Sequence, residues 1–347
     1  MDSIQMDSTK IRIPLREVSE VSDKIKGNWV LVNVDTGEQM DCEEWKRKAY
    51  FHESKGVKFR IALEKQPGRL GKVREYLTMM LTSKMLEGQY LEGIHLKNIK
   101  RLYKYIIDTG LASFSFDAFM NAECTDTDFK KDFENKAGVE LVRLMLQRAK
   151  PKKTGMAARE WKKKLNKGIQ WSERKSTAFK TNPYLKVYSK YCDLKSKSKK
   201  FAQAYDIEVS EEYWRIEATV KNRKHWRTFD IEDTSLKSIL SLSKDIKKEI
   251  LNRAMRVHLL PIRGHRKVSE GISPRDRLLY NLMLNAINLG QSYTIIEGEA
   301  LQGLSPSNKS KKRKQLLSIY ENHILPTEVG RKSENLDLAL EGMGYDF

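Results

Sequence analysis

The sequence predicts an α+β protein, with a mainly antiparallel central sheet flanked by helices and a C-terminal helical domain of helix-turn-helix type. Two segments, 184–188 and 213–220, show the alternation of side chains that is typical of strands. Beyond about residue 232 the apolar residues follow helical spacing instead. We therefore expect an N-terminal strand-containing segment over 1–66, a central domain over 67–231 and a helical domain over 232–347.

The earlier elements follow from turn residues and apolar spacing. Strands are expected at Trp29–Val34 and Val57–Leu63, separated by an Asp35-Thr-Gly turn, and Pro67-Gly68 then interrupts the chain. Gly110 ends a predicted helix. The remaining predictions up to residue 150 are helices over 71–86, 96–109, 116–119 and 140–149, and a strand over 122–129.

The C-terminal part has the order of a helix-turn-helix reader. Helices are predicted over 236–242, 245–257 and 275–289, the last ended by Gly290. A short helix over 299–304, a turn at Ser305-Pro306 and a basic helix over 309–324 follow. A reader of this type places its second helix in the major groove of DNA. The alternative is an ordinary helical hairpin with a lysine-rich face.

The positive charge is unevenly distributed. The formal net charge is +19, and residues 148–200 hold 18 Lys and Arg against three acids. Such clustering favours a polyanion partner, because each phosphate contact releases a condensed counterion. The alternative is a solvated, lysine-rich surface. The DNA-binding residues that we predict are Lys186, Arg215, Lys309, Lys311, Lys312, Arg313 and Lys314.

Several other classes of protein are disfavoured. The three cysteines are far apart and form no C-x-x-C pair, so neither a disulfide framework nor a zinc knuckle is expected. The sequence has no apolar run of signal-peptide or membrane-spanning length, and we expect a cytoplasmic protein with no membrane partner. Phosphate-loop, dinucleotide-binding and zinc-protease motifs are absent, and no His-x-His pair occurs.

Carboxylates on predicted strands are the candidate metal ligands. Asp126 and Asp128 are two residues apart and share one face of their strand. Glu217 shares a face with Arg215 and Thr219. Oxygen ligands of this kind suit Mg²⁺ or Mn²⁺. The alternatives are an exposed acidic strand for the aspartates and an outer-face salt bridge for Glu217.

Tyr188 is the candidate nucleophile. Most tyrosines in strands only pack, but a phenol near a cation can attack phosphorus, and Lys186 and Lys190 lie two residues to either side. In that reaction a divalent ion polarises the phosphate, and the tyrosine displaces the 3′ oxygen. The product is a 5′-phosphotyrosyl link that conserves the bond energy for rejoining.

At these residues the chain resembles the replication initiators of rolling-circle plasmids and single-stranded DNA phages, in the group that lacks a two-histidine site. The likeness covers about residues 55–225. It includes the segment Tyr90-Leu-Glu-Gly-Ile94 with Asn98. Four motifs carry it in order: Thr125–Phe133, Gly168-Ile-Gln-Trp171, Tyr184-Leu-Lys-Val-Tyr-Ser-Lys190 and Tyr213–Lys221.

The resemblance implies a metal-dependent enzyme that binds an origin, nicks one strand and starts rolling-circle replication. Tyr188 would be its nucleophile, and Lys190 would contact phosphate or stabilise the phenolate. Asp126, Asp128 or both would bind the metal with Glu217. Lys130-Lys131 before Asp132 leaves open which acid is the ligand. Tyr191 is an alternative or second nucleophile, and the role of Asp193 is open.

The partners that this function implies are origin DNA, single-stranded and duplex, and the host helicase and polymerase. If a phage or plasmid encodes the chain, the compartment is the bacterial cytoplasm. Two other functions fit the same sequence. One is a non-catalytic origin-binding initiator or DNA-binding regulator, and the other is a mobilisation relaxase or transposase with related chemistry.

Overall fold

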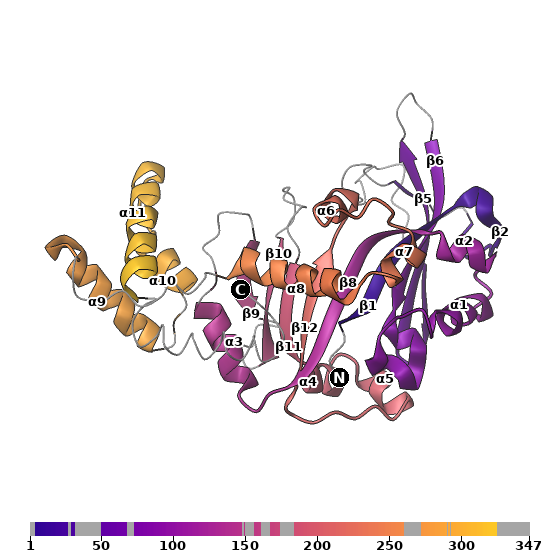
Figure 1. The fold of residues 1–347 in the computed structure, drawn as a ribbon, viewed down its shortest axis with the longest axis horizontal. Helices are drawn as coiled ribbons and strands as arrows, with labels where there is room; N and C mark the ends of the chain where they lie inside the picture. Colours follow the sequence, from indigo (N-terminus) through magenta and orange to yellow (C-terminus); the bar gives the residue numbers. More distant parts are fainter. Residues whose placement is uncertain are drawn as a thin grey trace. The chain divides into compact units, whose positions relative to one another are not determined.

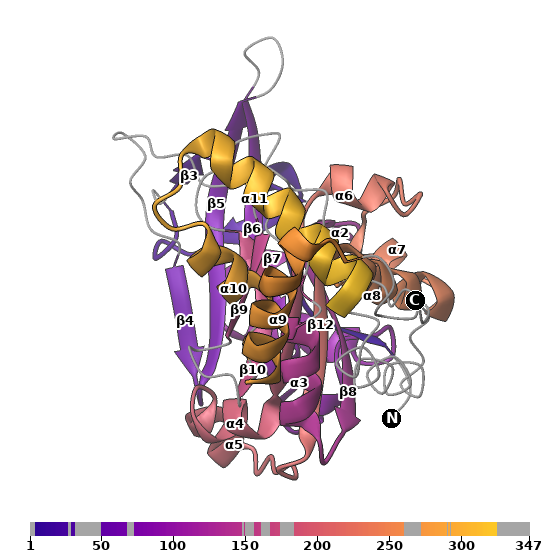
Figure 2. The ribbon, with the colours of Figure 1, turned by 90° about the vertical axis from the view of Figure 1, so that its left-hand side faces the viewer.

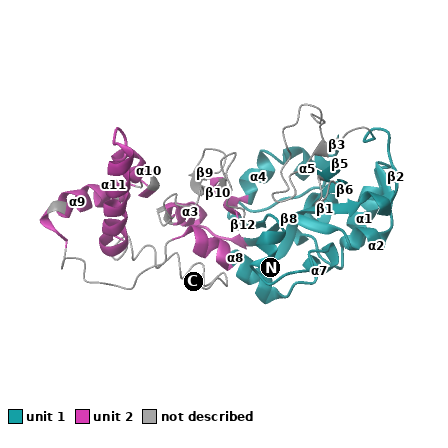
Figure 3. Ribbon diagram, turned by 90° about the horizontal axis from the view of Figure 1, so that it is seen from above, with its two compact units in different colours: residues 1–132, 180–183, 190–251 teal, residues 133–179, 184–189, 252–347 magenta. Residues whose placement is uncertain are grey.

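A computed structural model describes residues 4–26, 29–31, 50–67, 73–147, 149, 156–160, 167–173, 184–259, 272–289, 291 and 293–324 (Figure 1). Two compact units interleave along the chain. Unit 1 contains residues 1–132, 180–183 and 190–251, and unit 2 contains 133–179, 184–189 and 252–347 (Figure 3). The fold is α+β with a mostly antiparallel sheet, as predicted.

Unit 1 is built on strands that come from distant parts of the chain. Their order across the sheet is β3-β5-β6-β1-β8-β12, and β4 also pairs with β5. Only the β3–β5 pair among those with a described register is parallel. The strands are β1 (Gln5–Pro14), β3 (Trp29–Leu31), β4 (Tyr50–Ser54), β5 (Val57–Pro67), β6 (Val73–Thr82), β8 (Glu123–Glu134) and β12 (Tyr213–Val220). A separate pair joins β2 (Val18–Val21) to β7 (Ala112–Phe114).

The predicted helix over 71–86 is wrong, because this segment forms β6 and a following 3₁₀ segment, Ser83–Glu92. Leu77, Met79 and Leu81 recur at every second position and are at most 1% exposed. This period of two lets β6 pair with β1 on one side and β5 on the other. The segment contains many residue types that favour helices, but the alternation of its apolar side chains determined its structure.

The boundary predicted between residues 66 and 67 is also wrong. It separates β5 from β6, which are paired along Arg60–Pro67 and Val73–Met80. The N-terminal strand β1 lies between β6 and β8, in the interior of the same sheet. The first 66 residues therefore do not form a separate structural unit.

The helices of unit 1 lie closer to their predicted positions than β6 does. Ser115 and Ser235 cap α2 and α7 by accepting hydrogen bonds from backbone N–H groups three residues on, as short polar side chains do at helix starts. Gly110 follows α1 with a φ of 64°. The helices are α1 (Ile99–Asp108), α2 (Phe116–Met120), α4 (Lys190–Lys195), α5 (Lys199–Ala204), α6 (Arg223–Arg227), α7 (Leu236–Leu240) and α8 (Lys244–His258), whose residues from Asn252 onward belong to unit 2.

Within unit 2, α3 (Gly138–Gln147) accompanies three antiparallel strands, β9 (Met156–Glu160), β10 (Gly168–Glu173) and β11 (Tyr184–Ser189). Leu185 and Val187 of β11 are fully buried, whereas Tyr184 and Lys186 are half-buried. The alternation predicted for β11 is therefore present. Much of the basic stretch 148–200 lies outside the described residues.

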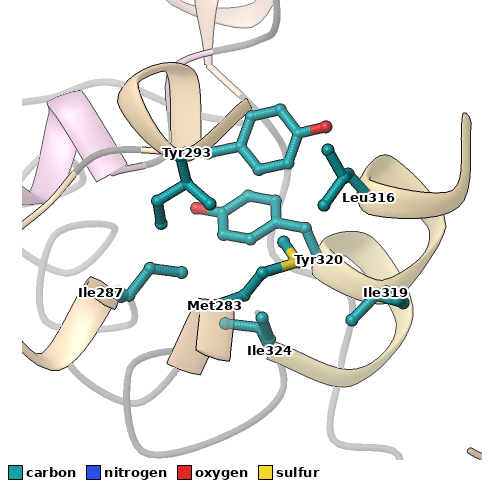
Figure 4. Packing of buried hydrophobic residues seen from close by; sticks show 8 residues of the cluster. Met283, Ile287, Tyr293, Leu316, Ile319, Tyr320 and Ile324 are labelled. Atoms are coloured by element: carbon teal, nitrogen blue, oxygen red, sulfur yellow. The ribbon is translucent and has the colours of Figure 1, made fainter. Parts of the chain in front are cut away.

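The C-terminal helices α9 (Pro274–Asn288), α10 (Tyr293–Ala300) and α11 (Pro306–Ile319) enclose a small core with a π-helical turn, Tyr320–Ile324 (Figures 2 and 4). The rings of Tyr293 and Tyr320 lie at its centre, 4.7 Å apart. On α9, Met283 and Ile287 face this core, whereas Leu278 and Leu282 are 69% and 58% exposed. Leu278 and Leu282 therefore lie on the outer side of α9.

Candidate nucleic-acid interface

One face of the unit 1 sheet is polar, although its strands are largely buried. Ser8, on β1, donates a hydrogen bond to Oδ2 of Asp128, on β8, at 2.7 Å. Thr219, on β12, donates to the other oxygen of the same carboxylate. Lys10 and Arg12 continue this face along β1 and pair with Glu64 of β5 at 2.8 and 3.2 Å. Three neighbouring strands and β5 thus contribute polar side chains to one surface.

Arg215 anchors the other end of this face. Its guanidinium donates to both carboxylate oxygens of Asp132 at 2.5 and 2.8 Å and to Asp7 at 2.9 Å. The side chain is fully buried. The structure therefore corrects the prediction that Arg215 contacts DNA, since its donors already hold buried carboxylates. Its position instead suggests that it fixes the relative arrangement of β12, β8 and the start of β1.

Three cations surround the buried ring of Tyr90. The ammonium of Lys190 lies 4.9 Å from the ring centroid, Arg215 lies at 5.4 Å and Lys130 at 5.7 Å. Lys190 also pairs with Asp193 at 3.0 Å, which gives that acid a structural partner. These groups, with Asp7 and Asp132, are called the Arg215 cluster below.

The Arg215 cluster shifts the ionisation of its members. Burial and the neighbouring Arg215 lower the pKa of Lys130 to about 8. Burial alone would raise the pKa of Asp7, but Arg215, Lys130 and Lys190 hold it well below its ordinary value. Burial raises the pKa of Tyr90, although Lys190 and Arg215 oppose the rise. The cluster is therefore a set of mutually compensating charges inside the protein.

The predicted metal ligands are only partly brought together. Asp126 and Asp128 lie next to each other along the polar face, as expected from their spacing, and Asp126 pairs with Lys221 at 3.8 Å. Glu217 is 4% exposed and lies 3.8 Å from Arg215. Among the described residues, no three acidic, histidine or cysteine side chains gather into a possible metal site. A metal site shared by Glu217 and one or both of Asp126 and Asp128 therefore stays a prediction, with Glu217 beside Arg215.

Asp126 nevertheless fits a simpler role as a metal ligand. Its side chain is 31% exposed and lines a cleft. Burial raises its pKa, although Lys221 and Lys10 oppose the rise. Mg²⁺ commonly binds to one or two protein carboxylates together with waters and substrate phosphates. The residues present therefore fit an ion held by Asp126, alone or with Asp128, and completed by a phosphate.

The cleft beside Asp126 has a volume of about 650 Å³ and lies within unit 1. Its walls come from β1, β5, β6 and β8 and from the segment 221–235. Backbone hydrogen bonds hold that segment against the start of β8, from Cys124 to Thr234 at 2.7 Å and from Leu236 to Ala122 at 2.9 Å. The side chains around it are predominantly charged or polar.

Tyr188 lies on β11, a strand of unit 2. It pairs with Gly168 across β10 and β11, and it is 5% exposed. Gly168 has a φ of 140°, and a Cβ there would lie 2.3 Å from the carbonyl oxygen of Val187 and 2.6 Å from the Cα of Tyr188. Only glycine allows the two backbones to approach this closely beside the candidate nucleophile.

The basic residues of α11 divide into two groups. Arg313 pairs with the buried Glu297 of α10 at 2.6 Å, and Lys312 donates to Gln315 at 3.3 Å. Lys311 and Lys314 are exposed and Lys309 is half-exposed, and none of these three has an ion-pair partner among the described residues. Arg313 therefore joins α11 to α10, Lys312 is engaged within α11, and the second group is available to phosphate.

Sequence reasoning missed the central roles of Asp7, Tyr90 and Lys130. Asp7 precedes the main alternation of β1, at a bulge between Met6 and Ser8 that the sequence does not reveal. Tyr90 had a signal, because it begins one of the segments that resemble phage proteins. Lys130 also had a signal in the sequence, because a lysine inside an alternating strand must either be exposed or pair with buried acids.

No protein-family model matches the chain, and no curated protein matches it significantly. In the described part of the chain, no helix is long and apolar enough to cross a membrane.

Proposed function

We propose that the protein is a DNA-binding replication initiator that nicks and rejoins one strand through Tyr188. The observation that carries the proposal is the gathering of predicted site residues on one sheet face. Asp126 and Asp128 come from β8 and Glu217 from β12, and the ammonium of Lys190, at the start of α4, lies in the Arg215 cluster beside them. Segments separated by up to about ninety residues thus converge where the sequence motifs resemble such initiators.

In the proposed reaction, the oxygen of Tyr188 forms a bond to phosphorus while the bond from phosphorus to the 3′ oxygen breaks. The phenol loses its proton, and the departing 3′ oxygen gains one. The products are a free 3′-hydroxyl and a 5′-phosphotyrosyl strand, and the reverse reaction rejoins them. A divalent ion, Mg²⁺ or Mn²⁺, would polarise the phosphate when bound at Asp126.

Different residues of the chain have different proposed roles in this reaction. The Arg215 cluster fixes β8 against β12, and so keeps Asp126 at the cleft. Lys190 lies within the cluster, paired with Asp193, and its proposed role is to hold α4, which follows the Tyr188 strand directly. The exposed lysines of α11 would contact the duplex, with α10 and α11 forming the helix-turn-helix pair.

A nicking assay tests the proposal. Supercoiled plasmid carrying the DNA that flanks the gene is incubated with Mg²⁺ or Mn²⁺, and covalent protein–DNA adducts are separated on a denaturing gel. We expect a 5′ adduct with the wild type and with Tyr184→Phe, a control on the same strand and face. Tyr188→Phe should form none. Equal nicking by Tyr188→Phe would remove Tyr188 from the chemistry.

A non-catalytic origin-binding initiator is the second candidate, and the 5% exposure of Tyr188 favours it. A phenol this deeply covered can attack DNA only if the layer over it moves. Under this function, all three proteins would shift duplex DNA in a native gel, and none would form an adduct at any metal concentration.

A further inference from the structure

The outer face of α9 is apolar and exposed. Leu278, Leu282 and Leu289 are 69%, 58% and 85% exposed, and Leu289 directly follows the helix. The opposite face of α9 carries Met283 and Ile287 into the core of the C-terminal helices (Figure 4). The helix therefore has two apolar faces, and the small core uses only one of them. An exposed apolar face beside a complete core is typical of a binding surface.

The exposed positions have the spacing of a seam between two helices. Four of them are separated by four, three and four residues: Leu278, Leu282, Asn285 and Leu289. This spacing places side chains on one stripe of a helix, and in coiled coils such a stripe contacts a second helix. These four residues are called the outer stripe of α9 below. Its composition and spacing suit a helical partner with apolar residues at the same intervals.

The chain itself contains a segment with the same intervals. Residues 325–347 lie outside the described part of the chain. Within them, four apolar residues are also separated by four, three and four positions: Leu336, Leu340, Met343 and Phe347. Gly342 and Gly344 each cost a helix about 1 kcal/mol relative to alanine, so a helix over this segment needs a partner to stabilise it.

This segment begins close enough to α9 to reach the outer stripe. Ile324, the last described residue, is buried in the same core as Met283 of α9. The residues 325–335 number eleven and can span up to about 36 Å, at roughly 3.3 Å per residue. The 15 residues of α9 extend over only about 22 Å. A tether this short also gives an effective concentration of about millimolar, so a weak contact is enough.

Charge favours the same contact. Residues 333–347 contain four acids and no lysine or arginine. Arg277 is exposed next to the outer stripe, and the first turn of α9 accepts a hydrogen bond from Gln315 of α11. Lys311 and Lys314, also exposed, lie within about one turn of Gln315 on α11. One end of the outer stripe is therefore close to the cations that the proposed function assigns to DNA.

We propose that residues 333–347 bind the outer stripe of α9 in the same molecule and cover its leucines. Intervals of four, three and four are the same in both directions, so the segment matches the stripe in either orientation. Acids lie near both ends of the segment, at Glu334 and Asp346, and either orientation brings one toward Lys311 and Lys314. The bound segment then competes with DNA phosphates for these lysines. This competition alone rests on the proposed function.

Proteolysis of the full chain tests the contact without DNA or metal. A glutamate-specific protease should cut at Glu341 several-fold faster in Leu278→Gln/Leu282→Gln than in the wild type. Glutamine keeps the charge and the helix but removes the apolar contact, and the cleavage site itself is unchanged. Ile295→Gln, which replaces an apolar side chain of α10 that is 46% exposed, is the control and should be cut like the wild type. Equal rates in all three proteins would overturn the proposal.

Cross-linking distinguishes this segment from a second copy of the chain as the occupant. Leu282→Cys is combined with Leu340→Cys for one orientation and with Met343→Cys for the other. After mild oxidation, we expect one pair to give a monomer that migrates faster on a non-reducing denaturing gel. A band at twice the mass would contradict a contact within one molecule. So would a yield no higher than that of Glu299→Cys, an exposed position on α10, paired with the same cysteines.

Duplex binding tests the competition with DNA. Leu340→Gln/Met343→Gln should bind a 16-base-pair duplex several-fold more tightly than the wild type at low salt, and the gain should shrink as salt screens the charges. Adding Leu278→Gln/Leu282→Gln should bring no further gain, because both pairs break the same contact. Unchanged duplex affinity would overturn the competition. The protease and cross-linking results do not depend on DNA, so they hold even if Tyr188→Phe nicks normally.

Discussion

Arg215 shows how one buried side chain can be essential without touching a ligand. Its fully buried guanidinium neutralises Asp132, whose side chain is 8% exposed, and Asp7, whose side chain is 18% exposed. Removing one partner of a buried ion pair leaves an uncompensated charge, which typically costs about 3–5 kcal/mol. We expect Arg215→Ala to lower the free energy of urea unfolding by that amount. Arg227→Ala, which breaks an exposed pair with Glu232, should change it by less than about 1 kcal/mol.

Lowering the pH should destabilise the protein, because it protonates the carboxylates of Asp7 and Asp132. A carboxyl whose pKa is depressed by folding contributes stability above its unfolded pKa of about 3.9, and that stability is lost as the pH falls. The pKa of Asp7 and that of Asp132 are both lowered by Arg215. The urea midpoint should therefore drop between pH 5 and 3. Asp7→Asn should show a shallower drop, whereas Asp108→Asn, an exposed control at the end of α1, should follow the wild type.

Substitution by alanine should lower the stability at Gly168 and raise it at Gly298. Gly168→Ala places a Cβ against the backbone of β11 at a φ of 140°, so we expect a lower melting temperature and misplacement of Tyr188. Gly298 lies exposed in α10 with nothing within 4 Å. Gly298→Ala should raise stability by about 0.5–1 kcal/mol, the usual gain for glycine in a helix. Circular dichroism melts of both would check the pair.

Among the elements, α11 places a basic first half directly after its N-terminus. Cations there oppose the positive end of the helix dipole unless a phosphate lies nearby. Lys311→Ala/Lys314→Ala should therefore weaken duplex binding and reduce its salt slope by about 1.8, roughly 0.9 for each contact. Lys237→Ala, an exposed lysine on α7, is the control and should not change duplex binding. Equal duplex binding by the double variant and the wild type would contradict the role proposed for α11.

The elements also show what sequence reasoning can reach. β12 begins and ends as predicted, because its alternation runs unbroken from Tyr213 to Val220. α1, α2, α7 and α9 were found from apolar spacing and, for α1 and α9, from the glycines that follow them in the sequence. β6 was mistaken for a helix, and β1 was missed, since both strands draw their stability from neighbours on either side rather than from local propensity.

For the whole molecule, the fold class was predictable and the division into units was not. Strand and helix periodicities are local, but the pairing of β1 with β8 joins residues more than a hundred positions apart. The candidate site shows the same limit. Spacing placed Asp126 beside Asp128, but only the three-dimensional pairing of β12 with β8 showed that Arg215 is occupied by Asp132.

The order of strands in unit 1 has a consequence for synthesis. β1 leaves the ribosome first, yet its neighbours β6 and β8 end at residues 82 and 134, and β8 is itself completed by β12, which ends at 220. At about 5–20 residues per second, roughly 10–40 seconds separate the emergence of β1 from that of β12. Through that interval the nascent chain carries open strand edges and uncompensated acids, so its yield should depend on chaperones that shield exposed edges.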